Sequence, residues 1–423
     1  MHFENSIQFS REQDSKDSLK AFRERFYFPL MNGKEVIYFT GNSLGLQPKS
    51  TQDYVLRELE DWATYGVEGH FHARNPWYHY KEFLKDSVSK LLGAKPEEVV
   101  VMNSLTVNLH LLLVSFYRPT KTRYKIICEY DAFPSDLYAV QSQAKFHDLN
   151  PEDAIVYLKP REGEYCLRTS DILQAIEEAG DSLATVMLGA VNYYTGQYFE
   201  LEKITKAAHA FGATCGFNLA HASGNVLMKL HDWRVDFACF CSYKYLNTGP
   251  GGVSGIFIHE NHFGKDLPQF AGWWGNDPET RFSIPREFIP VKAASAWALS
   301  NDPVLPMASL KASLDIFDEA GIENLRTKSE MLTAYLEFVV EEINKATDRT
   351  IKIITPKEKD QRGCQLSLVF AKRGKEIFNK LTELGVIADW REPDVIRVAP
   401  VPLYNTFVDV FRFGEILATS VKN

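Results

Sequence analysis

Residues 214–259, TCGFNLAHASGNVLMKLHDWRVDFACFCSYKYLNTGPGGVSGIFIH, contain three short apolar runs separated by more polar segments. Thr214–Leu219, Phe237–Ser242 and Gly252–His259 each have the length and the apolar content of a buried strand. We therefore predict that this part of the chain supplies three strands to one sheet.

The same pattern extends towards the N-terminus. Tyr124–Glu129 and Ala184–Gly189 are further predicted strands, while Ser170–Ala179 and Glu202–Phe211 have the apolar spacing of amphipathic helices. Alternation of buried strands with helices favours an α/β fold whose large domain has a mostly parallel central sheet flanked by helices.

The character of the sequence changes near Asp302. Leu305–Ala346 is predicted as long helices with a break near Gly321. The predicted elements that follow are a strand at Ile351–Thr355, a strand at Cys364–Ala371, a helix at Lys375–Leu384 and a strand near Val395–Val398. We expect a large domain at 51–301, a smaller α+β C-terminal domain at 302–423, and an N-terminal segment, 1–50, that packs with the small domain.

Composition excludes several classes of protein. The chain has 423 residues and a formal net charge of −8, without a concentrated Lys/Arg block, so we expect no nucleic-acid partner. No apolar run approaches the roughly 18 residues of a membrane span, and the polar N-terminus has no signal-peptide core, so we expect no membrane partner. Six scattered cysteines lack a metal-binding spacing. They favour reduced thiols in a cytoplasmic protein without a bound metal.

Lys244 is the first candidate for chemistry. It lies in Ser242–Asn247, directly after a predicted strand and before the glycine-rich loop Gly249–Gly252. An amine at a strand end between aromatic side chains can be desolvated, which lowers its pKa and makes it a nucleophile or a former of Schiff bases. Taken alone, a lysine that extends to solvent from a strand end is the commoner explanation.

Two further segments favour a phosphate and a flat ring as ligands. Asn103–Asn108 follows a short apolar strand and opens a helix, whose free N–H groups and the Thr106 hydroxyl suit a phosphate. An ordinary N-cap explains the same pattern. Phe133–Asp136 follows the strand Tyr124–Glu129, and an aromatic side chain there can stack on a ring. A simple turn is the alternative.

Taken in order, these segments resemble the kynureninase family, from about Val36 to about Asp409. The resemblance is carried by Gly41–Pro48, Leu105–His110, Phe133–Asp136, Tyr194–Gln197, Leu219–Ala222, His231–Trp233, Cys241–Asn247 and Arg397–Asn405. It implies the fold of fold-type-I enzymes that use pyridoxal 5'-phosphate (PLP). In such enzymes an acidic residue on a strand faces the pyridine nitrogen, a histidine packs on the ring, and the lysine follows. Asn218, His221 and Lys244 have this order and spacing.

The resemblance also assigns site residues. Lys244 would carry PLP as a Schiff base, with Tyr243 as a general acid, and both would contact the cofactor. The other implied cofactor contacts are Leu105, Thr106, Phe133, Pro134, Ser135, Asp136, Asn218 and His221, together with Trp273 and Asn301 from the partner chain of a homodimer. The implied substrate contacts are Ser43, His70, Asn276, Ser300, Asn301 and Arg397. Arg397 suits the planar α-carboxylate of an amino-acid substrate.

The implied reaction is hydrolysis of the Cβ–Cγ bond of L-kynurenine, or of its 3-hydroxy derivative, in tryptophan catabolism. The products are anthranilate, or 3-hydroxyanthranilate, and L-alanine.

The chain departs from the family pattern near the expected pocket. Asn218 stands where the family has Asp, Gly189 where some relatives have Ser, Asn192 where some have His, and Asn276 where His is common. Asp302 also replaces the more usual Pro. A neutral amide loses the charge pairing with a protonated pyridine, so we expect Asn218 to lower turnover while cofactor binding survives.

Three alternatives remain open at this point. The first is a kynureninase-like PLP enzyme with another substrate or with weakened activity. The second is another fold-type-I enzyme, such as a class-V aminotransferase or a cysteine desulfurase. A desulfurase needs a cysteine on a mobile loop, whereas the cysteines here lie in or beside predicted strands. The third is a PLP-binding protein that has lost catalysis.

Overall fold

The computed structural model describes residues 2–283, 286–347 and 351–422. Its centre is a seven-stranded sheet with the strand order β4-β10-β9-β8-β7-β5-β6. The strands are β4 (Val99–Val101), β5 (Lys125–Glu129), β6 (Ile155–Leu158), β7 (Leu183–Gly189), β8 (Thr214–Asn218), β9 (Phe237–Cys241) and β10 (Ser254–Ile258). From β6 to β9 all neighbours are parallel, and β10 is antiparallel to both β9 and β4. The predicted mostly parallel α/β sheet is therefore confirmed.

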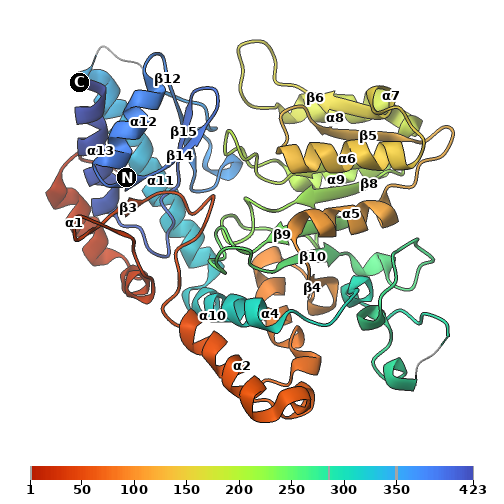
Figure 1. Ribbon diagram of the computed structural model, residues 1–423. Helices are drawn as coiled ribbons and strands as arrows, with labels where there is room; N and C mark the ends of the chain where they lie inside the picture. Colours follow the sequence, from red (N-terminus) through yellow and green to blue (C-terminus); the bar gives the residue numbers. More distant parts are fainter. Residues whose placement is uncertain (1, 284–285, 348–350, 423) are drawn as a thin grey trace.

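Helices cover both faces of this sheet (Figure 1). The strands carry few polar side chains because both faces are buried; every residue of β9, FACFC, is buried. The helices that pack around the sheet include α5 (Leu105–Phe116), α6 (Pro134–Phe146), α8 (Thr169–Ala179) and α9 (Leu201–Ala210), with the short α7 (Pro151–Ala154) beside β6. The result is a layered core in which the carboxyl ends of the parallel strands lie along one edge of the sheet.

A second, four-stranded antiparallel sheet lies in the C-terminal part, in the blue region of Figure 1. Its order is β11 (Ile351–Ile353), β12 (Leu366–Phe370), β15 (Val395–Val398) and β14 (Asp389–Arg391). The helices around it are α11 (Ile322–Ala346), α12 (Gly374–Glu383) and α13 (Phe407–Lys422). Leu332, Val339, Leu368, Ile396 and Val410 belong to their shared apolar core.

The N-terminal segment contacts this C-terminal sheet and its helices. α1 (Ile7–Lys16) packs against α13. β3 (Ile37–Tyr38) pairs in parallel with β13 (Val386–Ile387), and a small hairpin of β1 (Leu30–Met31) and β2 (Lys34–Glu35) precedes it.

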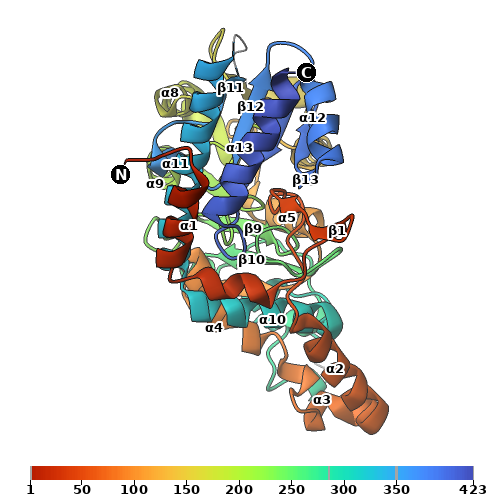
Figure 2. The same cartoon turned by 90° about the vertical axis from the view of Figure 1, so that its left-hand side faces the viewer.

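Two long helices join the halves of the molecule. α10 (Val304–Ala320) packs against α2 (Thr51–Tyr65) and α4 (Glu82–Leu92), whereas α11 packs against α13. Figure 2 shows α2 and the short α3 (Gly69–His72) extending away from the rest of the molecule. No helix within the described part of the chain is long and apolar enough to cross a membrane.

Candidate functional site

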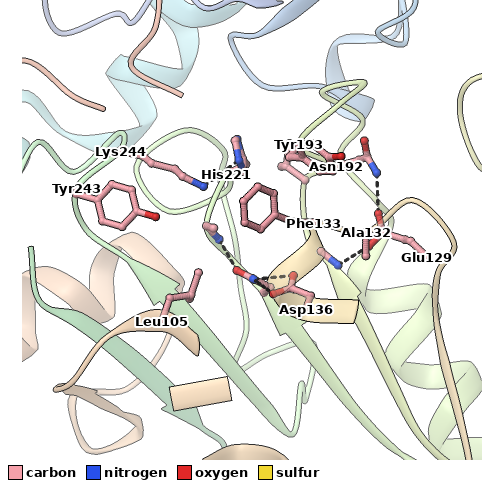
Figure 3. Close-up of a pocket in the computed structure, with 14 residues that line it drawn as sticks. Leu105, Glu129, Ala132, Phe133, Asp136, Asn192, Tyr193, His221, Tyr243 and Lys244 are labelled. Carbon is pink, nitrogen blue, oxygen red and sulfur yellow. Dashed lines mark hydrogen bonds between the residues drawn. The ribbon is translucent and has the colours of Figure 1, made fainter. Parts of the chain in front are cut away.

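A pocket opens where β5, β7 and β8 end, beside the first residues of α5 and α6 (Figure 3). Its walls are formed by Leu105, Glu129, Ala132, Phe133, Asp136, Gly189, Val191, Asn192, Tyr193, Asn218, Ala220, His221, Tyr243 and Lys244. The carboxyl ends of parallel strands are the usual place for ligands in open α/β sheets.

Lys244 and His221 meet on one side of this pocket. The Lys244 Nζ lies 3.0 Å from the His221 Nε2, and burial lowers the pKa of the lysine. Burial also holds the pKa of His221 well below its usual value, with the nearby Lys244 charge acting in the same direction. The His221 Nδ1 is buried and has no hydrogen-bond partner among the described residues. A neutral imidazole therefore faces an amine whose charged form is disfavoured by burial.

Asn218 and Asp136 meet at the base of the pocket. The Asn218 Nδ2 donates to both carboxylate oxygens of Asp136, at 2.9 and 2.8 Å, while the Asn218 Oδ1 accepts from the backbone N–H of Ala220. Burial raises the pKa of Asp136 to about 6, although the Asn218 hydrogen bonds and the Lys244 charge oppose the rise. A titratable carboxyl is thus in contact with the Asn218 amide.

The remaining walls suit a flat ring with a phosphate. Phe133 is the N-cap residue of α6, followed by Pro134 and Ser135 in its first turn, and its ring remains 42% exposed along the pocket. α5 begins at Leu105, and the side chain of its N-cap residue Ser104 makes no capping hydrogen bond. The first N–H groups of that helix, near Thr106, have no intrahelical partner. Together with the orphaned His221 Nδ1, these features fit PLP.

Arg397 lies behind the pocket wall. It is fully buried on β15; its Nη1 donates to the carbonyl oxygen of Tyr193 at 2.6 Å and its Nη2 to the carboxylate of Asp389. The Arg397 Nε is buried without a hydrogen-bond partner among the described residues. The Nε is therefore the one nitrogen of this guanidinium without a partner in the described part of the chain.

The other predicted substrate and partner residues do not line this pocket. Ser43 lies partly buried in the turn after β3, and its N–H donates to the Thr40 carbonyl oxygen. His70 lies on α3 with its ring edge-to-face against Trp77. Asn276 is buried but engaged in its own loop, where its side chain bonds to the backbone of Ile289 and Asp277.

Three further predicted residues are exposed. Trp273 is 49% exposed, and Ser300 and Asn301 are exposed beside the segment that leads into α10. Trp273 follows Gly272 in a short turn, and its indole nitrogen donates to the Arg281 carbonyl oxygen. None of these three side chains lines the pocket of its own chain.

Glu129 and Tyr193 were not among the site residues predicted from the sequence, and Asn192 was noted there only as a departure from the family pattern. Glu129, Asn192 and Tyr193 form the wall opposite Lys244 (Figure 3). One signal was available: Glu129 is the only charged residue at the carboxyl end of the apolar run IICE. A charge at that end of a parallel strand is expected to face a ligand site.

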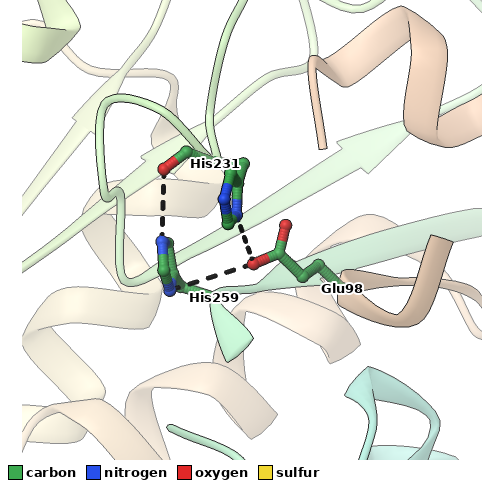
Figure 4. Close-up of side chains that lie close together, drawn as sticks. All are labelled: Glu98, His231 and His259. Atoms are coloured by element: carbon green, nitrogen blue, oxygen red, sulfur yellow. Dashed lines mark hydrogen bonds and ion pairs between the residues drawn. The ribbon is translucent and has the colours of Figure 1, made fainter. Parts of the chain in front are cut away.

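A second cluster of titratable groups lies elsewhere, between β4 and β10 (Figure 4). The His231 Nδ1 is 2.9 Å from a Glu98 carboxylate oxygen, and the rings of His231 and His259 are stacked. The His259 Nδ1 accepts the Asn261 N–H, and Glu98 accepts the N–H groups of Lys95 and Glu260. Because the atoms that would bind a metal are engaged in these hydrogen bonds, the cluster serves to join three segments of backbone.

Solved structures and curated proteins resemble the chain at two levels. A cysteine desulfurase from Thermococcus onnurineus NA1 superimposes with a TM-score of 0.77 over 95% of this chain and 98% of its own, at 19% identity. The cysteine desulfurase CsdA from Escherichia coli gives a TM-score of 0.76 at 17% identity, over 96% and 98% of the two chains. These similarities show the fold, in agreement with the predicted fold type.

Sequence similarity goes further. Residues 325–417 match the family described as "Kynureninase C-terminal domain". The chain is 54% identical to the kynureninase of Flavobacterium psychrophilum, over all of this chain and 99% of that protein. It is 46% identical to the kynureninase of Mus musculus, over 96% of this chain and 91% of that protein. The chain therefore belongs to the kynureninase family.

Proposed function

We propose that this chain is a PLP-dependent kynureninase that hydrolyses the Cβ–Cγ bond of L-kynurenine, or of 3-hydroxykynurenine, to anthranilate, or 3-hydroxyanthranilate, and L-alanine. The observation that carries the proposal is the desolvated Lys244 amine, 3.0 Å from a neutral His221 inside a pocket with an aromatic wall. It occurs in a chain about half identical to kynureninases over their full length.

Each side chain then has a chemical task. Bound PLP supplies an aldehyde for the amine and a ring that accepts electrons from the substrate. Lys244, whose pKa is lowered by burial, is the nucleophile that would hold the cofactor and the base that would move the substrate Cα proton. Burial raises the pKa of Tyr243, so its phenol stays protonated and can deliver a proton to the leaving carbon. The unpaired Arg397 Nε supports a role for Arg397 in carboxylate binding.

Two measurements test this proposal. Borohydride reduction of the protein with bound PLP should place a stable pyridoxyl group on the peptide that contains Lys244, detected by mass spectrometry. Addition of L-kynurenine should release fluorescent anthranilate and one equivalent of L-alanine. A label at Lys244 without anthranilate would point to another PLP reaction, and absence of the label would remove the basis of the proposal.

We further propose a homodimer in which the partner chain supplies Trp273 and Asn301 to the site. Aromatic residues gather on one exposed surface: the ring of Phe282 contacts those of Trp273 and Tyr78, and Tyr78 also contacts Phe71. Phe71 and Phe282 are each more than half exposed. Such a surface is unusual for a monomer, and it carries residues that the family resemblance assigns to the site.

Mixed dimers test this arrangement. Lys244→Ala and Trp273→Ala each inactivate a homodimer, by removing the amine or the partner's contact. If the site is shared, unfolding and refolding an equal mixture should restore about a quarter of the native activity, because half of the dimers have one intact site. Recovery of no activity, together with a monomeric mass in solution, would contradict the shared site.

We also propose a cytoplasmic location. All six cysteines are free in the structure, five of them buried, as is typical of a protein kept in a reducing compartment. Cell fractionation with an antibody against the chain tests this location.

A further inference from the structure

Glu129 is a buried carboxylate without an assigned task. It lies at the end of β5, 4% exposed, and accepts two hydrogen bonds, from the Gly189 backbone N–H at 2.7 Å and from the Asn192 Nδ2 at 2.8 Å. A Cβ at position 189 would lie 3.3 Å from the Glu129 Oε2, closer than most such contacts. Gly189 therefore provides the room in which this carboxylate reaches the loop after β7.

Asn192 organises that loop. While its Nδ2 donates to Glu129, its Oδ1 accepts from the backbone N–H groups of Tyr194 and Thr195, at 3.0 and 2.9 Å, and from the Thr195 hydroxyl. The orientation of the Asn192 amide is thus fixed from both sides, with its nitrogen towards an acceptor and its oxygen towards three donors. Any flip of the amide would break the bonds on both sides.

Tyr193 follows directly and connects the pocket with Arg397. Its ring lies edge-to-face with Phe133, at 5.4 Å between centroids, and the guanidinium carbon of Arg397 lies 6.0 Å from the centre of the same ring. Its carbonyl oxygen accepts hydrogen bonds from the Arg397 Nη1 at 2.6 Å and from Gln365 at 3.2 Å. Tyr193 therefore sets both a pocket wall and the position of the guanidinium.

The other partner of the guanidinium is acidic. The Arg397 Nη2 is paired with Asp389, which also contacts Arg391, and the Arg397 Nε is unpaired among the described residues. The direction of this fully buried guanidinium is fixed by its bonds to Tyr193 and Asp389, because it cannot rotate without losing them. The Tyr193 carbonyl supplies one of these two bonds.

We propose that Glu129 and Asn192 form a latch that positions Tyr193, and that Tyr193 in turn orients Arg397 for the α-carboxylate of the amino-acid substrate. This inference rests on the proposed function and adds positioning residues to it. Glu129, Asn192 and the Tyr193 carbonyl act on the substrate through Arg397. The latch should therefore affect substrates with an α-carboxylate and spare those without one.

An exchange of hydrogen-bonding groups tests the latch. In Glu129→Gln the new side-chain oxygen accepts from the fixed Gly189 N–H, so its NH₂ group faces the Asn192 Nδ2, donor against donor. In Asn192→Asp two carboxylates face each other. In the double variant Glu129→Gln/Asn192→Asp, the amide introduced at position 129 donates to the carboxylate introduced at position 192, which still accepts from Tyr194 and Thr195. The double variant restores the bond with its direction reversed.

We expect the variants to change KM for L-kynurenine more than kcat. Each single variant should raise KM for L-kynurenine about tenfold, with a smaller change in kcat, and the double variant should return KM to within about threefold of the native value. Binding of kynuramine, the analogue that lacks the α-carboxylate, should change little in all three variants. Glu162→Gln, at an exposed position, is the matched control and should change neither value.

A second readout does not depend on catalysis. In the cofactor-free protein, hydrogen exchange of the peptide that covers residues 190–198 should be faster in Glu129→Gln and should return to the native rate in the double variant. If the wild type releases no anthranilate, the proposed function fails, and this exchange measurement still tests the latch. Equal loss of kynurenine and kynuramine binding would overturn the inference, as would failure of the double variant to restore either readout.

Discussion

Buried carboxylates occur at both ends of the parallel sheet, and they differ in what faces them. At the carboxyl ends of the strands, burial raises the pKa of Glu129 to about 7 and that of Asp136 to about 6. At the amino end of β9, Asp236 is also buried, yet its pKa falls to about 2. Burial alone would raise it, but His209 and His262 each place an Nε2 at 2.7 Å from its oxygens.

The difference separates a structural site from a ligand site. Asp236 has both imidazoles and the Cys215 N–H as partners, so its charge is satisfied within the chain. Glu129 and Asp136 accept hydrogen bonds only from neutral groups of the protein in the described structure. The protein thus leaves these two carboxyl groups without a charged partner at the carboxyl ends of the strands. A charged cofactor or substrate can supply that partner.

The largest expected effect is a loss of activity on substitution of Lys244, in the pocket at the carboxyl ends of the strands. Lys244→Ala removes the only amine in the described pocket and its contact with His221. Steady-state anthranilate release should fall by at least about 10³-fold, the range of a lost proton-transfer group. Lys206→Ala, on the exposed side of α9, is the control and should retain full activity. Substantial activity in Lys244→Ala would place the reacting amine elsewhere.

The next largest effect is a loss of stability on substitution of Asp236, at the amino end of β9. Asp236→Asn leaves two imidazoles facing an amide, which cannot accept from both of them and from the Cys215 N–H. We expect a loss of about 4 kcal/mol in the free energy of unfolding at pH 7, the scale for breaking a buried pair. Urea titration measures this loss, and activity per folded molecule should be unchanged.

The same variant has a defined pH dependence. Because the folded pKa of Asp236 is depressed, its contribution is complete above the unfolded value near 4 and is lost as the pH falls towards about 2. The difference between wild type and Asp236→Asn should thus shrink as the pH falls below 4. A difference that stays constant down to pH 3 would contradict the role of this carboxylate.

The contribution of Glu129 to the free energy of unfolding should change with pH in the opposite direction to that of Asp236. The pKa of Glu129 in the folded protein lies above its ordinary value of 4.5. The folded protein is therefore most stable, relative to Glu129→Gln, below pH 4.5, where Glu129 is protonated in both the folded and the unfolded state. This stability is lost as the pH rises from 4.5 to about 7. Relative to Glu129→Gln, the wild type should lose about 3 kcal/mol of unfolding free energy between pH 4 and pH 8. Denaturant titrations at four or five pH values measure the slope, and a flat difference would contradict it.

Sequence patterns predicted the parallel core but not every strand direction. Phe237–Ser242 and Thr214–Leu219 differ from the observed β9 and β8 by one residue each, because a strand buried on both faces is continuously apolar. A continuously apolar run does not reveal the direction of its strand, so Gly252–His259 gives no sign that β10 runs antiparallel to β9. The predicted three-part division into domains stays a prediction.

The site divides in a similar way. Lys244 and Phe133 could be found from the sequence because each lies within four residues of a strand end. His221 was predicted from the family resemblance. The latch could not, because Glu129 and Asn192 are 63 residues apart and meet only through the loop after β7. Residues such as Trp273 were predicted from the family resemblance alone, and one chain leaves them on its surface.

The smallest effect is expected at Asn218, where two changes can be compared. Asn218→Asp introduces the carboxylate that the family resemblance predicts at this position, and it should raise kcat about tenfold by stabilising a protonated pyridine. It also places two carboxylates within hydrogen-bonding distance, since the Asn218 Nδ2 lies 2.8 Å from Asp136, so the cofactor-free protein should lose stability above pH 6. The exchanged pair Asp136→Asn/Asn218→Asp keeps one carboxylate and one amide in contact. It should therefore gain the rate without the loss of stability, measured by anthranilate release and by thermal unfolding of the cofactor-free protein. If both variants turn over at the native rate, the amide at position 218 is not what limits catalysis in this chain.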